Sequence, residues 1–76
     1  MKDVLEWIAQ HLVDEPDSVE VTEVPGERGT LYELRVAQDD MGKVIGRSGR
    51  TARAIRTVMK ASAARNDTHV SVDIVE

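Results

Sequence analysis

Apolar residues recur with two different periods along the chain, and the change of period divides it into helices and strands. From Asp3 to about Asp14 they fall at helical spacing, which predicts an amphipathic helix. Asp3 is placed to cap this helix, with Glu6 three residues later as its capping-box partner. Trp7 is expected to pack at the edge of the apolar stripe. Pro16 ends the helix, because the residue before a proline avoids the helical conformation.

Strict alternation of apolar and polar residues follows, which is typical of half-buried strands. Valines alternate with polar residues over positions 18–24 and predict one strand. Residues 25–29, Pro-Gly-Glu-Arg-Gly, have the composition and length of a hairpin loop. Tyr32 and its apolar neighbours alternate with polar residues over positions 30–37, which predicts a second strand with Tyr32 in the core.

Helical spacing returns in the second half of the chain. It predicts a short helix over residues 41–45 and a long helix over residues 50–65. After a break at residues 66–68, alternating apolar residues predict a last strand over residues 70–74. The long helix divides into two faces on a helical wheel. Its basic face holds Arg50, Arg53, Arg56 and Lys60, and its apolar face holds Ala52, Ile55, Val58, Met59 and Ala63.

These elements predict an α+β fold with the order α-β-β-α-α-β. The hairpin makes the first two strands antiparallel, and the two-helix crossover makes the third strand parallel to the second. We therefore expect a three-stranded mixed sheet that carries all three helices on one face. With 76 residues, the chain is expected to form a single domain over residues 1–76.

Charge is distributed unevenly along the sequence. The net charge is −4 at pH 7, yet residues 41–66 contain seven lysines and arginines and no acid. Residues 1–40 contain eleven acids and three bases. A solvated helix normally mixes both signs, so a long segment without any acid favours an anionic partner.

The tetrapeptide Gly46-Arg47-Ser48-Gly49 joins the two helices of the second half. Two glycines three residues apart let the backbone turn sharply and leave its amides uncovered by side chains. A phosphate can then approach these amides, and the positive end of the following helix favours its charge. The same glycines can also simply end one helix and begin the next. The tetrapeptide therefore indicates a phosphate site only together with its flanking residues.

Other functional classes find little support in the sequence. There is no cysteine, which excludes disulfides and thiolate metal sites. Asp39 and Asp40 lack a third ligand, so we expect one of them to be an N-cap. Ser48 is not in a Gly-x-Ser-x-Gly context, and His11 and His69 lie far from it in sequence, so no catalytic residue is expected. No apolar run reaches membrane-spanning length, and acids occupy the N-terminal segment where a secretory signal would be apolar. A cytoplasmic protein without a cofactor, metal or small-molecule substrate is therefore expected.

Residues 42–55, Gly-Lys-Val-Ile-Gly-Arg-Ser-Gly-Arg-Thr-Ala-Arg-Ala-Ile, resemble the Val-Ile-Gly-x-x-Gly signature of the K-homology (KH) family. The predicted order of elements is similar to the type II form of that domain. The single-domain length is similar to that of the small bacterial KhpA family of RNA-binding proteins. This resemblance implies an RNA chaperone and post-transcriptional regulator, linked to cell-wall and cell-shape control. It also implies a second KH-containing partner or self-association, and no enzymatic activity.

The resemblance further implies that the Gly-x-x-Gly loop clamps the backbone of about four nucleotides of single-stranded RNA. Arg47 and Ser48 would donate hydrogen bonds to phosphates. Lys43, Arg50 and Arg53 would supply positive charge around them. The RNA-binding residues implied in this way are Lys43, Val44, Ile45, Gly46, Arg47, Ser48, Gly49, Arg50, Ala52 and Arg53.

The apolar members of this set, Val44, Ile45 and Ala52, would offer a floor to the bases. Ala52 departs from the branched aliphatic residue that many KH domains carry there, which leaves base preference open. Two alternatives also stay open. The same groove can hold another protein, and a backbone clamp can hold single-stranded DNA.

Overall fold

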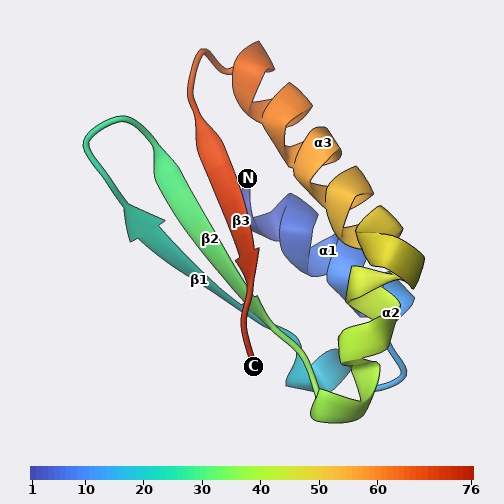
Figure 1. The fold of residues 1–76 in the computed structure, drawn as a ribbon. Coiled ribbons are helices and arrows are strands. Elements are labelled where there is room, and N and C mark those ends of the chain that lie inside the picture. The colour runs from blue at the N-terminus through green and yellow to red at the C-terminus, as the bar shows by residue number, and fades with distance from the viewer.

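Three helices lie on one side of a three-stranded sheet (Figure 1). The computed structural model describes residues 1–76, and the predicted order α-β-β-α-α-β is confirmed. Three single turns of 3-10 helix join these elements, at Pro16–Ser18, Gln38–Asp40 and Arg47–Gly49. The elements are α1 (Lys2–Leu12), β1 (Glu20–Pro25), β2 (Thr30–Arg35), α2 (Met41–Ile45), α3 (Arg50–Arg65) and β3 (Val70–Ile74).

The sheet has the strand order β1-β2-β3. β1 pairs antiparallel with β2, with Val21 opposite Leu34. β3 pairs parallel with β2, with Val72 beside Tyr32. The mixed sheet expected from the hairpin and the two-helix crossover is therefore confirmed, and β1 and β3 form its two edges.

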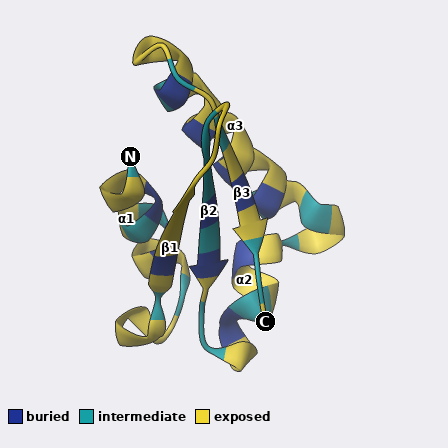
Figure 2. Cartoon of the chain, turned by 90° about the vertical axis from the view of Figure 1, so that its left-hand side faces the viewer, coloured by how far each residue is buried: buried dark blue, intermediate teal, exposed yellow.

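The hydrophobic core lies between the sheet and the helices. Because side chains alternate along a strand, each strand turns every second residue towards the helices. Figure 2 shows the buried positions distributed over the strands and helices instead of being gathered in one element. The core cluster consists of Leu5 and Ala9 from α1, Val21, Tyr32, Leu34 and Val72 from the sheet, and Ile55 and Met59 from α3.

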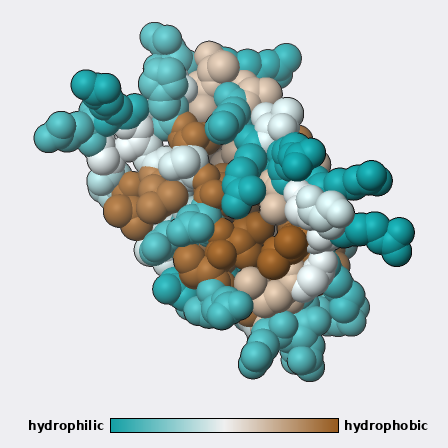
Figure 3. Space-filling model, viewed as in Figure 1, coloured by the Kyte–Doolittle hydropathy of each residue, from teal (hydrophilic) through white to brown (hydrophobic).

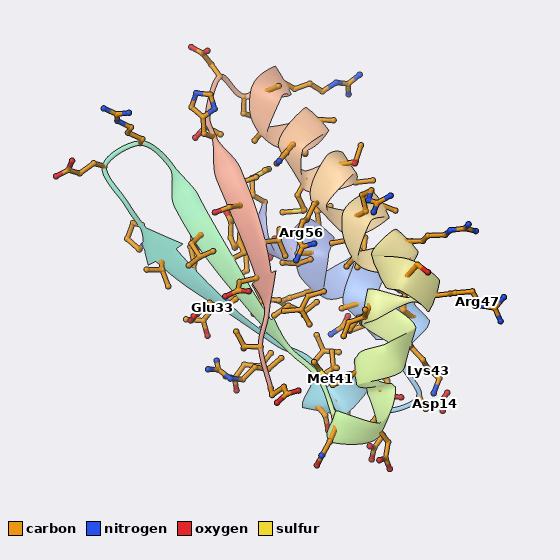
Figure 4. All side chains as sticks on the ribbon, viewed as in Figure 1. Asp14, Glu33, Met41, Lys43, Arg47 and Arg56 are labelled. Atoms are coloured by element: carbon orange, nitrogen blue, oxygen red, sulfur yellow. The ribbon has the colours of Figure 1, made fainter.

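The opposite face of the sheet carries no helix and holds the alternate residues of each strand. Glu33 and Asp73 lie side by side there in the parallel β2–β3 register. Like charges at such neighbouring positions repel, so they are tolerated only where water screens them. Figure 4 shows Glu33 on the side of the sheet away from the helices. The β2–β3 half of this face is therefore acidic, whereas Val24 and Leu31 pair on the same face between β1 and β2.

The N-terminal helix differs from the prediction in its cap and in its exposed face. Met1 occupies the N-cap position and no side chain caps the helix, so the predicted Asp3–Glu6 capping box is wrong. Trp7 does not pack into the core: it is 61% exposed. It lies two residues from both Leu5 and Ala9, which places it on the far side of the helix from these buried residues. The Trp7 ring instead contacts that of His11, with ring centroids 4.1 Å apart.

Element boundaries elsewhere agree within two residues. β1 begins at Glu20 because Pro16–Ser18 forms a 3-10 turn, and β2 ends at Arg35. The bounds predicted for α2, α3 and β3 are confirmed. None of the helices has both the length and the hydrophobicity needed to cross a bilayer. One expectation for α3 is wrong: Val58 is 48% exposed and is not part of its buried face.

The contrast between Met59 and Val58 gives a test of this core. Met59 is fully buried, so Met59→Ala should lower the free energy of unfolding by about 2–5 kcal/mol through lost burial and a cavity. Val58→Ala, one residue earlier on the same helix, should change it by less than about 0.5 kcal/mol. Urea denaturation of both variants measures this. Equal effects at the two positions would contradict the orientation of α3.

Candidate nucleic-acid interface

The Gly-x-x-Gly tetrapeptide forms a tight turn between α2 and α3. Gly46 ends α2, and its amide donates to the Gly42 carbonyl oxygen at 2.9 Å. The next turn closes with the Gly49 amide donating to the Gly46 carbonyl oxygen at 3.1 Å. Gly46, Ser48 and Gly49 all have positive φ angles, of 75°, 57° and 75°. The chain thus reverses within four residues and enters α3 at Arg50.

Gly46 is required for a close approach as well as for its backbone conformation. A Cβ atom on Gly46 would lie 2.3 Å from the Thr51 Oγ1 atom and 2.8 Å from the Thr51 nitrogen. A Cβ atom on Gly49 would meet nothing within 4 Å. The loop is therefore pressed against the first turn of α3 at Gly46 and open at Gly49.

The first turn of α3 has no side-chain cap. Gly49 occupies its N-cap position, and it has no side chain that could bond to the first amides of the helix. The Arg50 amide donates to the Arg47 carbonyl oxygen, and the amides that follow it carry the positive end of the helix dipole. An anion such as a phosphate can satisfy them.

Three arginines with free charges surround this turn. Arg47, Arg50 and Arg53 are exposed, and no salt bridge holds them, since the salt bridges of the chain involve only Lys2 and Lys43 as cations. Figure 4 shows Arg47 directed outwards, away from the sheet. Ser48, between Arg47 and Gly49, is also exposed. The structure thus brings together the loop and most of the basic residues expected at the site.

Lys43 does not belong with these free cations. Its Nζ atom lies 3.0 Å from an Asp14 carboxylate oxygen and 3.3 Å from Asp40 Oδ1. Hydrogen bonds to the Asp14 and Asp40 side chains raise the pKa of Lys43 above its usual value. Because two acids offset its charge, Lys43 contributes to the structure and adds little positive field. The absence of acids from residues 41–66 did not indicate this pairing, because Asp14 and Asp40 both lie outside that segment.

Of the apolar residues expected under the bases, only Ile45 offers surface. It is 39% exposed, whereas Val44 and Ala52 are buried. Val44 and Ala52 therefore support the loop from beneath. A hollow of about 450 Å³ lies beside α2, lined by Val36, Gln38, Met41 and Glu76, none of which was singled out from the sequence.

Apolar and polar residues line this hollow in equal number, with Val36 and Met41 beside Gln38 and the acidic Glu76. Figure 3 shows hydrophobic surface gathered near the middle of the view, between α3 and the sheet. Figure 4 shows Met41 on the side of α2 that faces the end of β3. The surface that starts at the Gly-x-x-Gly loop thus combines free cations with the exposed Ile45 and a partly apolar hollow, a combination suited to a flexible polyanion with flat apolar groups.

A buried carboxylate holds α2 in place. Asp40 is almost fully buried and accepts hydrogen bonds from the backbone amides of Asp14 and Glu15, at 3.2 and 3.1 Å, and from Lys43. We call these four residues the Asp40 clasp. Asp40 occupies the N-cap position of α2, as predicted for one of the two aspartates, but its side chain makes no capping hydrogen bond to the helix. Its side chain instead ties the chain after α1 to the start of α2.

The clasp shifts the titration of Asp40. Burial alone would raise the pKa of this carboxyl. The hydrogen bonds from the Asp14 and Glu15 amides, together with the bond and the charge of Lys43, outweigh burial and hold the pKa below its ordinary value. Asp40 is therefore ionised at neutral pH.

Comparison with known proteins identifies this arrangement of elements and loop. The family model described as KhpA/KhpB, KH domain matches residues 2–74. The chain belongs to this family. The proteins named RNA-binding protein KhpA from Clostridium acetobutylicum and Chlamydia caviae are similar to it over 75 and 76 residues. The first is 56% identical, with 99% of this chain and 100% of that protein covered. The second is 49% identical, with 100% and 97% covered.

A solved structure contains the same fold over nearly the whole of this chain. A variant of Era from Aquifex aeolicus, bound to GDP and AlF4−, superposes on this chain with a TM-score of 0.65 at 18% identity. The match covers 96% of this chain and 28% of the Era chain. KhpA proteins form a KH-domain family that is not enzymatic, in agreement with the expectation from the sequence.

The contact at Gly46 leads to a test of the loop geometry. Gly46→Ala should lower the free energy of unfolding by about 1–3 kcal/mol, because its backbone conformation and the contact with Thr51 both oppose a side chain. Gly42→Ala is the matched control, since a Cβ atom there meets nothing within 4 Å and alanine favours the helix. Urea denaturation compares the two variants. A Gly46 variant as stable as the control would refute the close approach.

The clasp predicts a pH-dependent loss of stability. Asp40→Asn should destabilise the domain at neutral pH, because it removes a charged acceptor and brings an amide NH₂ towards the Asp14 and Glu15 amides. The folded-state pKa of Asp40 is lowered, so its contribution is complete above the ordinary carboxyl pKa of about 4 and is lost as the pH falls through the lowered value. The natural chain should therefore lose its advantage in free energy of unfolding over Asp40→Asn as the pH falls.

Asp39→Asn is the control for this experiment. Asp39 is exposed and precedes Asp40, and its side chain makes no hydrogen bond. Denaturation midpoints measured from pH 7 down to pH 3 should show the narrowing only for the Asp40 variant. If the midpoint of the Asp40 variant stayed below that of the natural chain by the same amount at every pH, the charge of Asp40 would not be the cause of the difference.

Proposed function

We propose that this chain is a single-stranded RNA-binding protein whose Gly46–Gly49 loop clamps the RNA backbone. One observation carries the proposal: the uncapped start of α3 adjoins a tight glycine turn and three arginines without salt bridges. Relatives 46–56% identical to it are named RNA-binding proteins, which supports the same ligand here.

The clamp works through the backbone first. A phosphate approaches the first turn of α3 beyond the Arg50 amide, where Gly49 supplies no capping side chain. Arg47 and Ser48, exposed at the tip of the turn, donate to the same or the neighbouring phosphate. Arg50 and Arg53 hold the strand along the first turns of α3. Ile45 and the hollow beside Met41 then receive the bases.

The family resemblance extends this proposal to the cellular role. The protein acts in the cytoplasm as an RNA chaperone and post-transcriptional regulator, with a link to cell-wall and cell-shape control. It works with a second KH-containing protein or with another copy of itself. The physical support for a partner is the size of the site, since one KH domain holds only about four nucleotides. Two joined sites raise avidity by roughly 10²–10⁴ without new contacts.

The clamp is tested by reversing the polarity of the loop. The double variant Arg47→Asp/Ser48→Asp should bind short single-stranded RNA at least about tenfold more weakly, because charge-assisted hydrogen bonds to phosphate are lost and repulsion replaces them. Its melting temperature should stay nearly unchanged, because both side chains are exposed. Fluorescence anisotropy with a labelled oligonucleotide and thermal denaturation measure the two effects.

The matched control is Gln10→Asp/Arg28→Asp, which changes the net charge equally at exposed positions on α1 and in the hairpin loop. This variant should keep most of the affinity for RNA.

The salt dependence of RNA binding gives a second test. For the natural chain, the logarithm of the binding constant should fall linearly with the logarithm of the salt concentration, with a slope of about −2 if three phosphates are engaged. A folded loop variant with full affinity would refute the clamp, and a flat salt response would favour protein binding in the groove.

A further inference from the structure

The Lys43 side chain lies close to the Gly-x-x-Gly loop although acids hold it. Lys43 belongs to the last turn of α2, which ends at Gly46. Figure 4 shows its side chain on the outer side of α2, between Arg47 on one side and Asp14 on the other. Lys43 is therefore on the side of the domain from which Arg47 reaches the RNA in the proposed clamp.

The two acids that hold Lys43 differ in how firmly they are fixed. Asp40 Oδ1 lies 3.3 Å from the Lys43 Nζ atom, and the Asp40 side chain is 2% exposed. Asp40 also accepts two backbone amides, so it cannot move without opening the fold. Asp14 Oδ2 lies 3.0 Å from the same Nζ atom, but the Asp14 side chain is 78% exposed. Lys43 is its only salt-bridge partner, so the Asp14 carboxylate is free to leave.

A phosphate can take the place of the Asp14 carboxylate at Lys43. An ammonium group has three N–H donors, so it can hold Asp40 and a second anion at the same time. Carboxylate and phosphate oxygens accept the same kind of charge-assisted hydrogen bond from it. The exchange leaves the Asp40 clasp closed, because the contribution of Asp14 to the clasp is its backbone amide and not its carboxylate.

The exchange has a cost that falls on RNA binding. Exposed ion pairs contribute little free energy, so a phosphate of an RNA strand already held at the loop can displace Asp14. The same pair must nevertheless be broken each time a phosphate reaches Lys43. The affinity for RNA is then lower than it would be with an unpaired lysine at this position.

We propose that Lys43 is a further phosphate site of the RNA-binding surface and that the Asp14 carboxylate is an intramolecular competitor for it; this rests on the proposed RNA-binding function. In the free domain, Asp14 occupies the place of a phosphate. RNA bound at the loop displaces Asp14, while Lys43 keeps its contact with Asp40. Asp14 thus lowers the affinity of the domain without contacting the RNA.

The test is to remove the competing charge. Asp14→Asn keeps the backbone amide that donates to Asp40, and it should bind an oligouridine heptamer about two- to fivefold more tightly than the natural chain does. The salt dependence should also become steeper, by about 0.7 in slope, because the phosphate then meets an unpaired cation instead of replacing a carboxylate. Fluorescence anisotropy with the labelled heptamer at several salt concentrations measures both effects.

Three further variants separate the competition from a general effect of charge. Asp17→Asn removes the same charge from an exposed acid outside any salt bridge, and it should change the affinity by less than about twofold. In a Lys43→Gln background, Asp14→Asn should have no more effect than Asp17→Asn has. Asp14→Ala should give the same gain as Asp14→Asn, and circular dichroism confirms that each variant is folded.

The possible results are distinct. Equal affinity of the folded Asp14 variants and the natural chain would overturn the inference, and so would a gain that persists in the Lys43→Gln background. Either result would leave Asp14 as a partner of Lys43 in the fold alone. Failure of the natural chain to bind the heptamer would instead overturn the proposed RNA-binding function, and this inference with it.

Discussion

A single buried carboxylate fixes the position of the Gly-x-x-Gly loop. Helix α2 has only five residues, too few to be stable by itself. Asp40 anchors its first turn to the amides of Asp14 and Glu15, and Val44 anchors its middle in the core. The loop follows directly after this helix, so its orientation relative to α3 depends on these two anchors. The loop therefore presents its amides from a rigid support, although it contains glycine at two of four positions.

Most of the fold could be predicted from the sequence, because each element has one buried face in a thin core. Alternating valines gave the strands, and the helical spacing around Ile55 and Met59 gave α3 with its observed bounds. The hairpin and the two-helix crossover then determined the directions of the three strands in the sheet. The family resemblance rested on the same segment, since the loop signature lies between two helices whose spacing is visible independently.

The errors concern contacts between residues that are distant in sequence. The pairing of Lys43 with Asp14, and that of Arg56 with the Val72 carbonyl, join elements whose approach no local pattern encodes. The hydrogen bonds that Asp40 accepts from the Asp14 and Glu15 amides are equally distant in sequence, although its N-cap position was predictable. Trp7 differs for another reason: it is large and apolar, but its angle around α1 turns it away from the side that Leu5 and Ala9 bury.

The bare acidic face of the sheet has a consequence for how the molecule meets a polyanion. Glu33 and Asp73 lie on the back of the sheet, whereas the arginines without salt bridges lie around the start of α3, so these two surfaces carry opposite charge within a net charge of −4. At distances beyond the Debye length of about 8 Å, the net charge is screened and neither attracts nor repels appreciably. At shorter range the electric field favours orientations in which the arginines face the polyanion and the sheet faces away from it. Encounters in which the acidic part of the sheet faces the polyanion are repelled. The fraction of encounters that lead to binding is therefore higher than the negative net charge of the chain suggests.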